Sequence, residues 1–197
     1  MKAGNNIHTV RLFDLLAMDG GEQFFESIAN SFVSKNADVE QFFREKAVQA
    51  TKLNTAATYL VISYEEKNFD LLGYFTLATK MLTLKRSSLS KTECKSISRF
   101  GYFDEDSQSY KLPAVLIAQF SRNFSENSKS ISGSELMDIA LDKIRDILHS
   151  TSGKAVFLEC EQSEKIIDFY TRHNFQPLGN TVFSKDNKEL TQLYMIL

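Results

Sequence analysis

The order of apolar and polar segments over residues 112–175 constrains the fold more than any other feature. Residues 112–120 begin with a leucine–proline pair and are mostly apolar, which predicts a short buried strand. After a polar stretch, apolar residues recur at helical spacing; they are Leu136, Met137, Ala140, Leu141, Ile144 and Leu148. Residues 154–161 predict a second strand, and residues 168–175 a second helix. This order predicts a parallel strand pair joined by a right-handed helical crossover.

The first of these helices begins with a capping signature. Ser132 is followed three residues later by Glu135, and Gly133 lies between them. The unpaired amides and the dipole at a helix start favour an anion, and glycine lets the backbone approach it closely. The pattern is consistent with a phosphate site. It is equally consistent with an ordinary capped helix that holds no ligand.

These segments resemble the GCN5-related N-acetyltransferases, the GNAT superfamily, over roughly residues 35–183. The superfamily's pyrophosphate loop, Gln/Arg-x-x-Gly-x-Gly/Ala, falls on residues 128–133, where Gly133 keeps the last glycine. Ser128 and Ile131 replace the usual first residue and first glycine. Residues 169–175 resemble its Phe-Tyr-x-x-x-Gly-Phe motif, with Asn174 at the glycine position. Asparagine tolerates the left-handed conformation of a helix C-terminus, so this replacement is mild.

The resemblance implies an N-acetyltransferase that moves an acetyl group from acetyl-CoA directly to a primary amine. The residues implied to hold acetyl-CoA are Gln119, Phe120, Ser121, Ser128, Lys129, Ser130, Ile131, Ser132, Gly133, Ser134 and Ser163. Tyr170 stands where the superfamily places the acid that protonates the coenzyme A thiolate, and a phenol has a pKa suited to that transfer. The alternative for Tyr170 is a core aromatic residue on its helix.

The general base is sought at the end of the second strand. Glu159 and Glu161 flank Cys160, and strand alternation directs both carboxylates to one face and the thiol to the other. Either carboxylate could take a proton from the attacking ammonium, and a solvated strand end is the alternative. No histidine is placed as a partner for Cys160. The three histidines and two cysteines lack ligand spacing, so no metal site is expected.

The rest of the chain completes an α/β fold. Helices are expected at residues 24–33 and 39–50, the latter started by Asp38 and Gln41; an opening strand is expected at residues 7–16. Further strands are expected at residues 57–64, 71–84, 176–184 and 190–197, with a bulge at Gly73. A polar insertion at about residues 85–110 contains a capped helix near residues 90–98. We expect a single GNAT-like domain over residues 1–197: a mixed, mostly antiparallel twisted sheet flanked by helices, with a splayed parallel strand pair.

Composition limits the partners. The net charge of −2 and the isoelectric point near 6.0 give no global basic field for nucleic acid. Two cysteines are too few for a disulfide framework, and no apolar run reaches membrane-spanning length. The sequence therefore predicts a cytoplasmic protein without a membrane partner. A homodimer is left open.

The sequence does not decide which class of molecule carries the acceptor amine. The layout resembles the GNAT branch of bacterial toxin acetyltransferases, which acetylate aminoacyl-tRNA and pair with an antitoxin. Basic residues of the insertion region form either a local RNA-binding patch or a solvated face; they are Lys80, Lys85, Arg86, Lys91 and Lys95. The acidic run at residues 104–106 offsets them, so the charge pattern favours a small-molecule or peptide amine over tRNA. A third possibility is a GNAT-like protein that binds acyl-CoA without catalysis.

Overall fold

The computed structural model describes residues 7–65, 68–126, 131–184 and 186–197. The chain divides into two compact units, Met1–Ala78 with Ala118–Ala140, and Thr79–Ile117 with Leu141–Leu197. Three elements run through both units: strands β3 (Asn68–Lys85) and β5 (Ser109–Arg122) and helix α6 (Gly133–Thr151). The expectation of one acetyltransferase domain stays a prediction.

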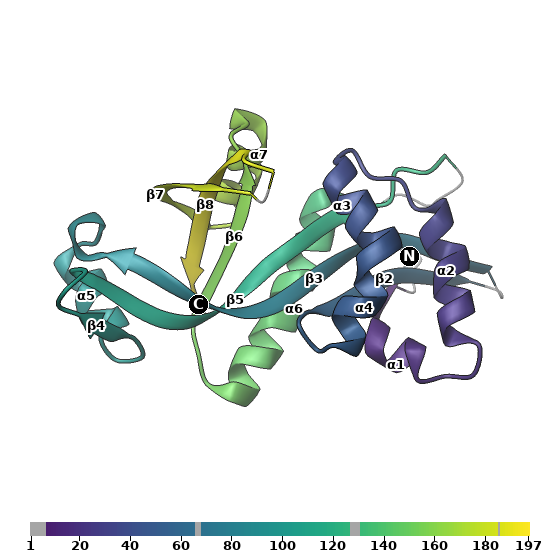
Figure 1. Cartoon of the computed structure of the whole chain (residues 1–197), viewed down its shortest axis with the longest axis horizontal. Helices are drawn as coiled ribbons and strands as arrows, with labels where there is room; N and C mark the ends of the chain where they lie inside the picture. Colours follow the sequence, from purple (N-terminus) through teal and green to yellow (C-terminus); the bar gives the residue numbers. More distant parts are fainter. Residues whose placement is uncertain (1–6, 66–67, 127–130, 185) are drawn as a thin grey trace, which may run out of the picture. The chain divides into compact units, whose positions relative to one another are not determined.

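In the first unit, helices cover one face of an antiparallel hairpin (Figure 1). Strand β1 (Ile7–Arg11) pairs with β2 (Ala57–Glu65), which pairs with β3. The helical elements are α1 (Leu12–Leu16), α2 (Gly21–Ser31), α3 (Ala37–Gln41), η1 (Phe42–Lys46) and α4 (Ala47–Lys52). Aromatic residues of the two expected helices form the core: Phe32 and Phe43 pack against Tyr74 of β3, and Phe25 packs against Phe43.

Two predictions for this unit were wrong in detail. The strand expected over residues 7–16 ends at Arg11, and residues 12–16 form helix α1 with Leu12 and Leu15 buried. The helix expected to start at Asp38 begins one residue earlier. Its cap is Asn36, whose side-chain oxygen accepts from the amides of Asp38 and Val39 at 2.9 and 3.2 Å. The helix also continues through a π-helical segment, η1, that no periodicity signalled.

The bulge expected at Gly73 is confirmed by a register shift opposite Val61 and Ile62. Glycine is required at this position because another element comes very close. A Cβ atom at Gly73 would lie 2.7 Å from the carbonyl oxygen of Ser121 and 3.1 Å from the Leu136 side chain. The end of β5 and the first turns of α6 therefore pack directly on β3.

The second unit contains the parallel step. Strand β5 pairs in parallel with β6 (Ala155–Glu161), which pairs antiparallel with β8 (Glu189–Ile196); β8 pairs antiparallel with the edge strand β7 (Gln176–Phe183). The β5–β6 ladder runs only from Ala114 and Ala155 to Ile117 and Leu158, although both strands continue beyond it. Helix α7 (Glu164–Arg172) connects β6 to β7.

The insertion is a small module of the second unit. It comprises η2 (Arg86–Ser88), helix α5 (Lys91–Ile97) and the short strand β4 (Tyr102–Asp104), which pairs with β5. Ser90 and Glu93 form the predicted capping box. The overall strand order is β1-β2-β3-β5-β6-β8-β7, with β4 beside β5. The predicted α/β class, a mostly antiparallel sheet with one parallel pair, is confirmed.

Candidate functional site

The end of β5, in the first unit, carries three of the residues expected to hold acetyl-CoA. The Ser121 hydroxyl donates to the carbonyl of Arg122 at 2.8 Å and lies 2.9 Å from the Ser34 hydroxyl. The Oε1 atom of Gln119 is buried and has no hydrogen-bond partner among the described residues. A buried acceptor without a donor is costly, so this atom is suited to a donor from a bound molecule.

Asn123, which the sequence analysis missed, fixes this strand end. Its side-chain amide donates to the Leu71 carbonyl at 2.9 Å, and its side-chain oxygen accepts from the amides of Val33 and Ser125 at 3.2 and 3.1 Å. The backbone amide of Asn123 also donates to the Leu72 carbonyl at 2.8 Å. The position of this polar residue directly after a strand was the sequence feature that could have marked it as a candidate.

The start of α6 keeps the expected cap. The Ser132 hydroxyl accepts from the Glu135 amide at 3.1 Å, and the Glu135 carboxylate accepts from the Ser132 amide at 2.9 Å. Those hydrogen bonds lower the pKa of the Glu135 carboxyl, so it is an anion at neutral pH. Gly133 is the first residue of the helix. Ile131 is buried, so its side chain packs in the interior. Ser128, Lys129 and Ser130 lie outside the described residues.

Two cations beside this helix start were also missed. The Arg122 guanidinium donates to the Ile131 carbonyl at 2.7 Å, and its central carbon lies 4.7 Å from the Phe124 ring centroid. The Lys35 ammonium lies 4.8 Å from the same ring. Two positive charges around one aromatic ring, close to a helix N-terminus, suit a phosphate group. The two cations are 87 residues apart in the chain, so no local pattern indicates that they lie close to one ring.

The second unit holds the other candidates. Glu159 and Glu161 are exposed and Cys160 is buried, as strand alternation predicted. The side-chain amide of Gln192, directly across on β8, donates to the Glu159 carboxylate at 2.8 Å. Ser163 is the residue before α7, and its side chain makes no capping hydrogen bond. Its amide donates to the Glu161 carbonyl at 2.7 Å.

Tyr170 lies on α7 among other aromatic rings. Its ring centroid is 5.1 Å from that of Phe169 and 5.9 Å from that of Phe175. Burial raises the pKa of the Tyr170 phenol, and the nearby Cys160 thiol raises it further, so the phenol holds its proton at neutral pH. The turn after α7 is closed by Asn174 with φ of 67°, the left-handed conformation expected where the superfamily has glycine.

Cys160 is not arranged as a nucleophile. Burial, together with the charge of Glu161, raises the pKa of its thiol to about 11. A thiol of that pKa is almost wholly protonated at neutral pH, and the thiolate is the reactive form.

A hollow of about 530 Å³ lies in the second unit, beside α7 and β7. Its lining contains none of the predicted site residues; it is formed by Gln162, Glu164, Ile167, Asp168, Pro177, Gly179, Thr181 and Thr191. Within the described ranges, no three histidine, cysteine or acidic side chains are grouped so that they could hold a metal ion. None of the described helices is long and apolar enough to span a bilayer.

The sequence matches no family model and no curated protein. Its structure, in contrast, is similar to several solved ones. AtaT complexed with acetyl-methionyl-tRNAfMet matches with a TM-score of 0.65 and 17% identity, over 96% of this chain and 94% of that one. A tyrosine-to-phenylalanine variant of KacT matches with a TM-score of 0.64 and 19% identity, over 97% of this chain and 95% of that one. AtaTR bound with AcCoA matches with a TM-score of 0.58 and 15% identity, over 97% of this chain and 93% of that one. At these identities the likeness establishes the fold alone: the chain has the fold of the AtaT and KacT structures.

Proposed function

We propose that this chain is an N-acetyltransferase that uses acetyl-CoA and acetylates the amino group of an aminoacyl-tRNA. The observation that carries the proposal is the shared fold, over nearly the whole of both chains, with an AtaT structure that contains acetyl-methionyl-tRNAfMet. The acceptor differs from the small-molecule or peptide amine favoured by the net charge of −2. That charge is a sum over the chain and does not describe a local surface.

The described residues of the first unit fit acetyl-CoA, which would supply the acetyl thioester. The buried Oε1 atom of Gln119 is ready to accept a hydrogen bond from an amide of the bound molecule. The first turn of α6, with Gly133, offers amides and a positive dipole end to the pyrophosphate. Arg122 and Lys35 add positive charge near this helix start.

In the second unit, Tyr170 is proposed as the acid for the departing thiolate. Its raised pKa keeps the phenol protonated over the whole physiological range, and it also makes transfer of the proton less favourable than from a free phenol. The base is assigned to the solvent-facing pair Glu159 and Glu161, directly or through water. Gln192 donates to the Glu159 carboxylate, and both glutamates are to be tested by replacement with glutamine.

An antitoxin partner is proposed on the same structural likeness. Similar structures include AtaT bound to the C-terminus of the antitoxin AtaR and acetyl-CoA, with a TM-score of 0.53 and 14% identity. The proposal is tested by expressing the chain in bacteria with and without the gene next to it. Growth arrest that the neighbouring gene relieves would support a toxin–antitoxin pair, and unaffected growth would count against one.

The acetyl-CoA site is tested by calorimetry on Gly133→Glu, which places a side chain and a negative charge at the start of α6. We expect binding to be lost, whereas Gln49→Glu, which adds the same charge on α4, should bind normally. Unchanged affinity in a folded Gly133→Glu protein would contradict the placement.

The acceptor is tested separately. The chain is incubated with acetyl-CoA and a mixture of charged tRNAs, and the released aminoacyl groups are analysed by mass spectrometry. Acetylated aminoacyl groups are expected. Acetylation of free amines but not of charged tRNA would return the acceptor to the small-molecule class.

A further inference from the structure

Three basic side chains follow one another at four-residue spacing along α5. They are Lys91, Lys95 and Arg99, the last in the turn that closes the helix. Residues four apart on a helix lie on one face, about 6 Å apart along the axis. All three are exposed, while Cys94 and Ile97, on the opposite side of the helix, enter the core of the module. The result is a short row of cations directed away from the protein.

No neighbouring acid neutralises this row. Within the described part of the chain, none of the three takes part in an ion pair. Glu93, the only acid on α5, is turned back to the cap, where its carboxylate accepts from the Ser90 amide at 2.7 Å. The three charges are therefore available to a partner.

Asp104, the first acid of the run at residues 104–106, is engaged elsewhere. Asp104 forms an ion pair with Lys111, and that contact, with hydrogen bonds from Ser107, lowers the pKa of Asp104 to about 2. The turn that carries the other two acids is tied to η2, since the Gln108 carbonyl accepts from the Arg86 amide at 2.9 Å. For this reason we leave Lys85 and Arg86, which adjoin that turn, out of the basic surface.

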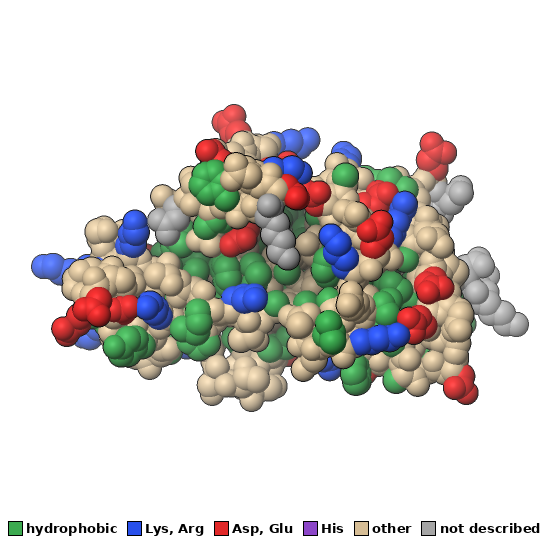
Figure 2. All heavy atoms as spheres, viewed as in Figure 1, with side chains coloured by type: hydrophobic (Ala, Val, Ile, Leu, Met, Phe, Trp, Pro, Cys, Tyr) green, Lys and Arg blue, Asp and Glu red, His purple; other side chains and the backbone are tan. Residues whose placement is uncertain are grey.

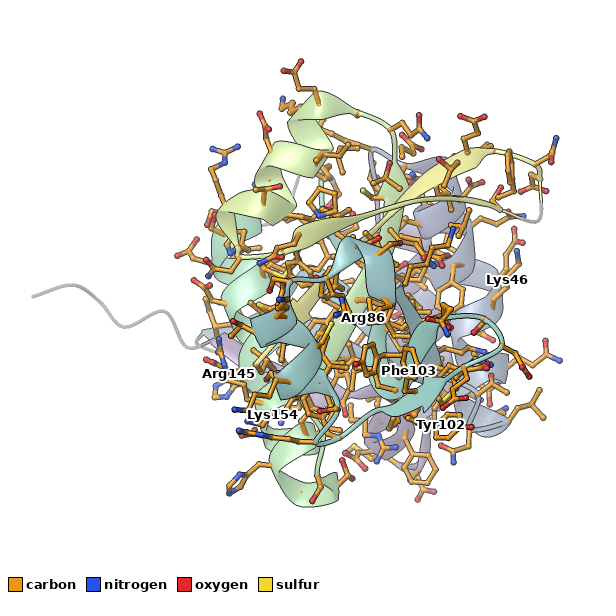
Figure 3. The ribbon with its side chains drawn as sticks, turned by 90° about the vertical axis from the view of Figure 1, so that its left-hand side faces the viewer. Lys46, Arg86, Tyr102, Phe103, Arg145 and Lys154 are labelled. Carbon is orange, nitrogen blue, oxygen red and sulfur yellow. The ribbon has the colours of Figure 1, made fainter. Side chains whose placement is uncertain are left out.

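An exposed aromatic residue follows the row closely in the chain. Tyr102 follows Arg99 by three residues, within about 10 Å along the chain, and its side chain is 70% exposed. Its register partner on β5 is Lys111, whose charge is already balanced by Asp104. Figure 3 shows Tyr102 and Phe103 on β4 at this end of the second unit. Exposed aromatic rings beside cations are typical of surfaces on which unpaired bases stack.

From these observations we propose that Lys91, Lys95, Arg99 and Tyr102, the α5 surface, bind tRNA. The cations contact successive phosphates of the backbone, and the tyrosine ring stacks on an unpaired base. The choice of tRNA as the nucleic acid rests on the proposed function. The net charge of −2 does not oppose this assignment. At physiological salt, charges are screened beyond about 8 Å, so a phosphate on this row interacts mainly with the row itself.

Basic residues elsewhere on the chain offer a matched control. On the face shown in Figure 2, Lys and Arg side chains are interspersed with Asp and Glu. Several basic residues elsewhere are paired with acids: Lys52 with Glu22, Lys143 with Asp146, and Arg145 with Asp142. These three paired cations provide a control that removes the same charge from other positions.

The test measures binding of fluorescein-labelled, deacylated tRNA by anisotropy as a function of salt. The variant Lys91→Gln/Lys95→Gln/Arg99→Gln should lower the slope of log K against log salt by about 2 to 3, since each phosphate contact contributes about 0.7 to 0.9. Its affinity at 0.1 M salt should fall by about tenfold or more. The control, Lys52→Gln/Lys143→Gln/Arg145→Gln, should keep the slope. Equal losses in both variants would show that net charge alone governs binding and would overturn the proposal.

Tyr102 has a separate signature. Tyr102→Ala should lower the affinity about 5- to 100-fold, the effect of losing one stacked base, without changing the salt slope. Tyr102→Phe, which keeps the ring, should bind tRNA with the wild-type affinity. An affinity unchanged in Tyr102→Ala would remove the stacking role.

The result is independent of catalysis. Because the probe carries no amino acid, the salt slope is measured whether or not the chain acetylates aminoacyl-tRNA. A slope that falls only in the α5 variant supports the α5 surface even if acetylation fails. If the Lys91→Gln/Lys95→Gln/Arg99→Gln variant acetylated charged tRNA with the wild-type KM, the α5 surface would not be a tRNA-binding site. The proposed function would remain intact. Acetyl-CoA affinity, measured by calorimetry, should be the same in all these variants.

Discussion

Ser132 and Glu135 exchange two hydrogen bonds at the start of α6, and the exchange places a carboxylate at the helix end proposed to hold a pyrophosphate. The Glu135 carboxylate satisfies the Ser132 amide, and its lowered pKa keeps it negative at neutral pH. Cap and ligand therefore compete for the positive end of the helix dipole.

This competition predicts that Glu135→Gln tightens acetyl-CoA binding. Glutamine keeps the capping hydrogen bond and removes the charge. Charge effects at helix ends are about 0.3 to 1 kcal/mol, so the dissociation constant should fall about two- to fivefold. Calorimetry at low salt measures it. Glu164→Gln, the same change in the first turn of α7, is the control. Weaker binding in Glu135→Gln would place the pyrophosphate elsewhere.

The segments that were predicted well are those with local signals. Two features depend on only a few neighbouring residues. They are the helix start at Ser132 and Glu135 and the alternation of Glu159, Cys160 and Glu161. The left-handed turn at Asn174 was expected from the resemblance to the superfamily motif, which has glycine at this position. Capping and alternation are set by neighbours in sequence, so no knowledge of the fold was needed.

The features that were missed depend on contacts between distant segments. Lys35 and Arg122 meet only at the Phe124 ring, and nothing in either segment marks that meeting. Helix α1 was taken for a strand because Leu12 and Leu15 are too few to define a period. Lys91 and Lys95 were weighed, together with Lys80, Lys85 and Arg86, against the whole acidic run, and only the structure shows that Asp104 is already paired.

The second prediction concerns the core of the first unit. The hydroxyl of the fully buried Tyr74 donates to the Val39 carbonyl at 2.6 Å and so links β3 to α3. Tyr74→Phe keeps the ring packing and removes this bond, which should lower the free energy of unfolding by about 1 kcal/mol. Urea unfolding measures the change. Tyr64→Phe, at an exposed tyrosine of β2, should leave stability unaltered, and equal effects of the two changes would contradict the assigned role of the Tyr74 hydrogen bond.

The third prediction concerns the pH dependence of Cys160. Its thiol has a pKa of about 11 in the folded protein, against about 8.5 for a free thiol. The folded pKa is the higher one, so burial of the neutral thiol contributes stability below about pH 8.5, and this contribution is lost as the pH rises towards 11. Alkylation of Cys160 by iodoacetamide, followed by mass spectrometry, should be slow at pH 7.5 and fast in urea. Rapid alkylation of the folded protein at pH 7.5 would contradict the assigned burial.

The last prediction tests Tyr170 as the acid. Tyr170→Phe keeps the ring among Phe169 and Phe175 but removes the only proton that the side chain can give. General acid catalysis contributes about 10²- to 10⁴-fold, so kcat for acetylation should fall by that factor, while the affinity for acetyl-CoA measured by calorimetry stays the same. Because the wild-type phenol has a raised pKa, its activity should show no loss from phenol ionisation up to about pH 10. Phe169→Leu, which alters packing on the same helix without removing a proton donor, controls for structural damage. If Tyr170→Phe turned over at the wild-type rate, the tyrosine would be a packing residue of α7, and the thiolate would take its proton from solvent.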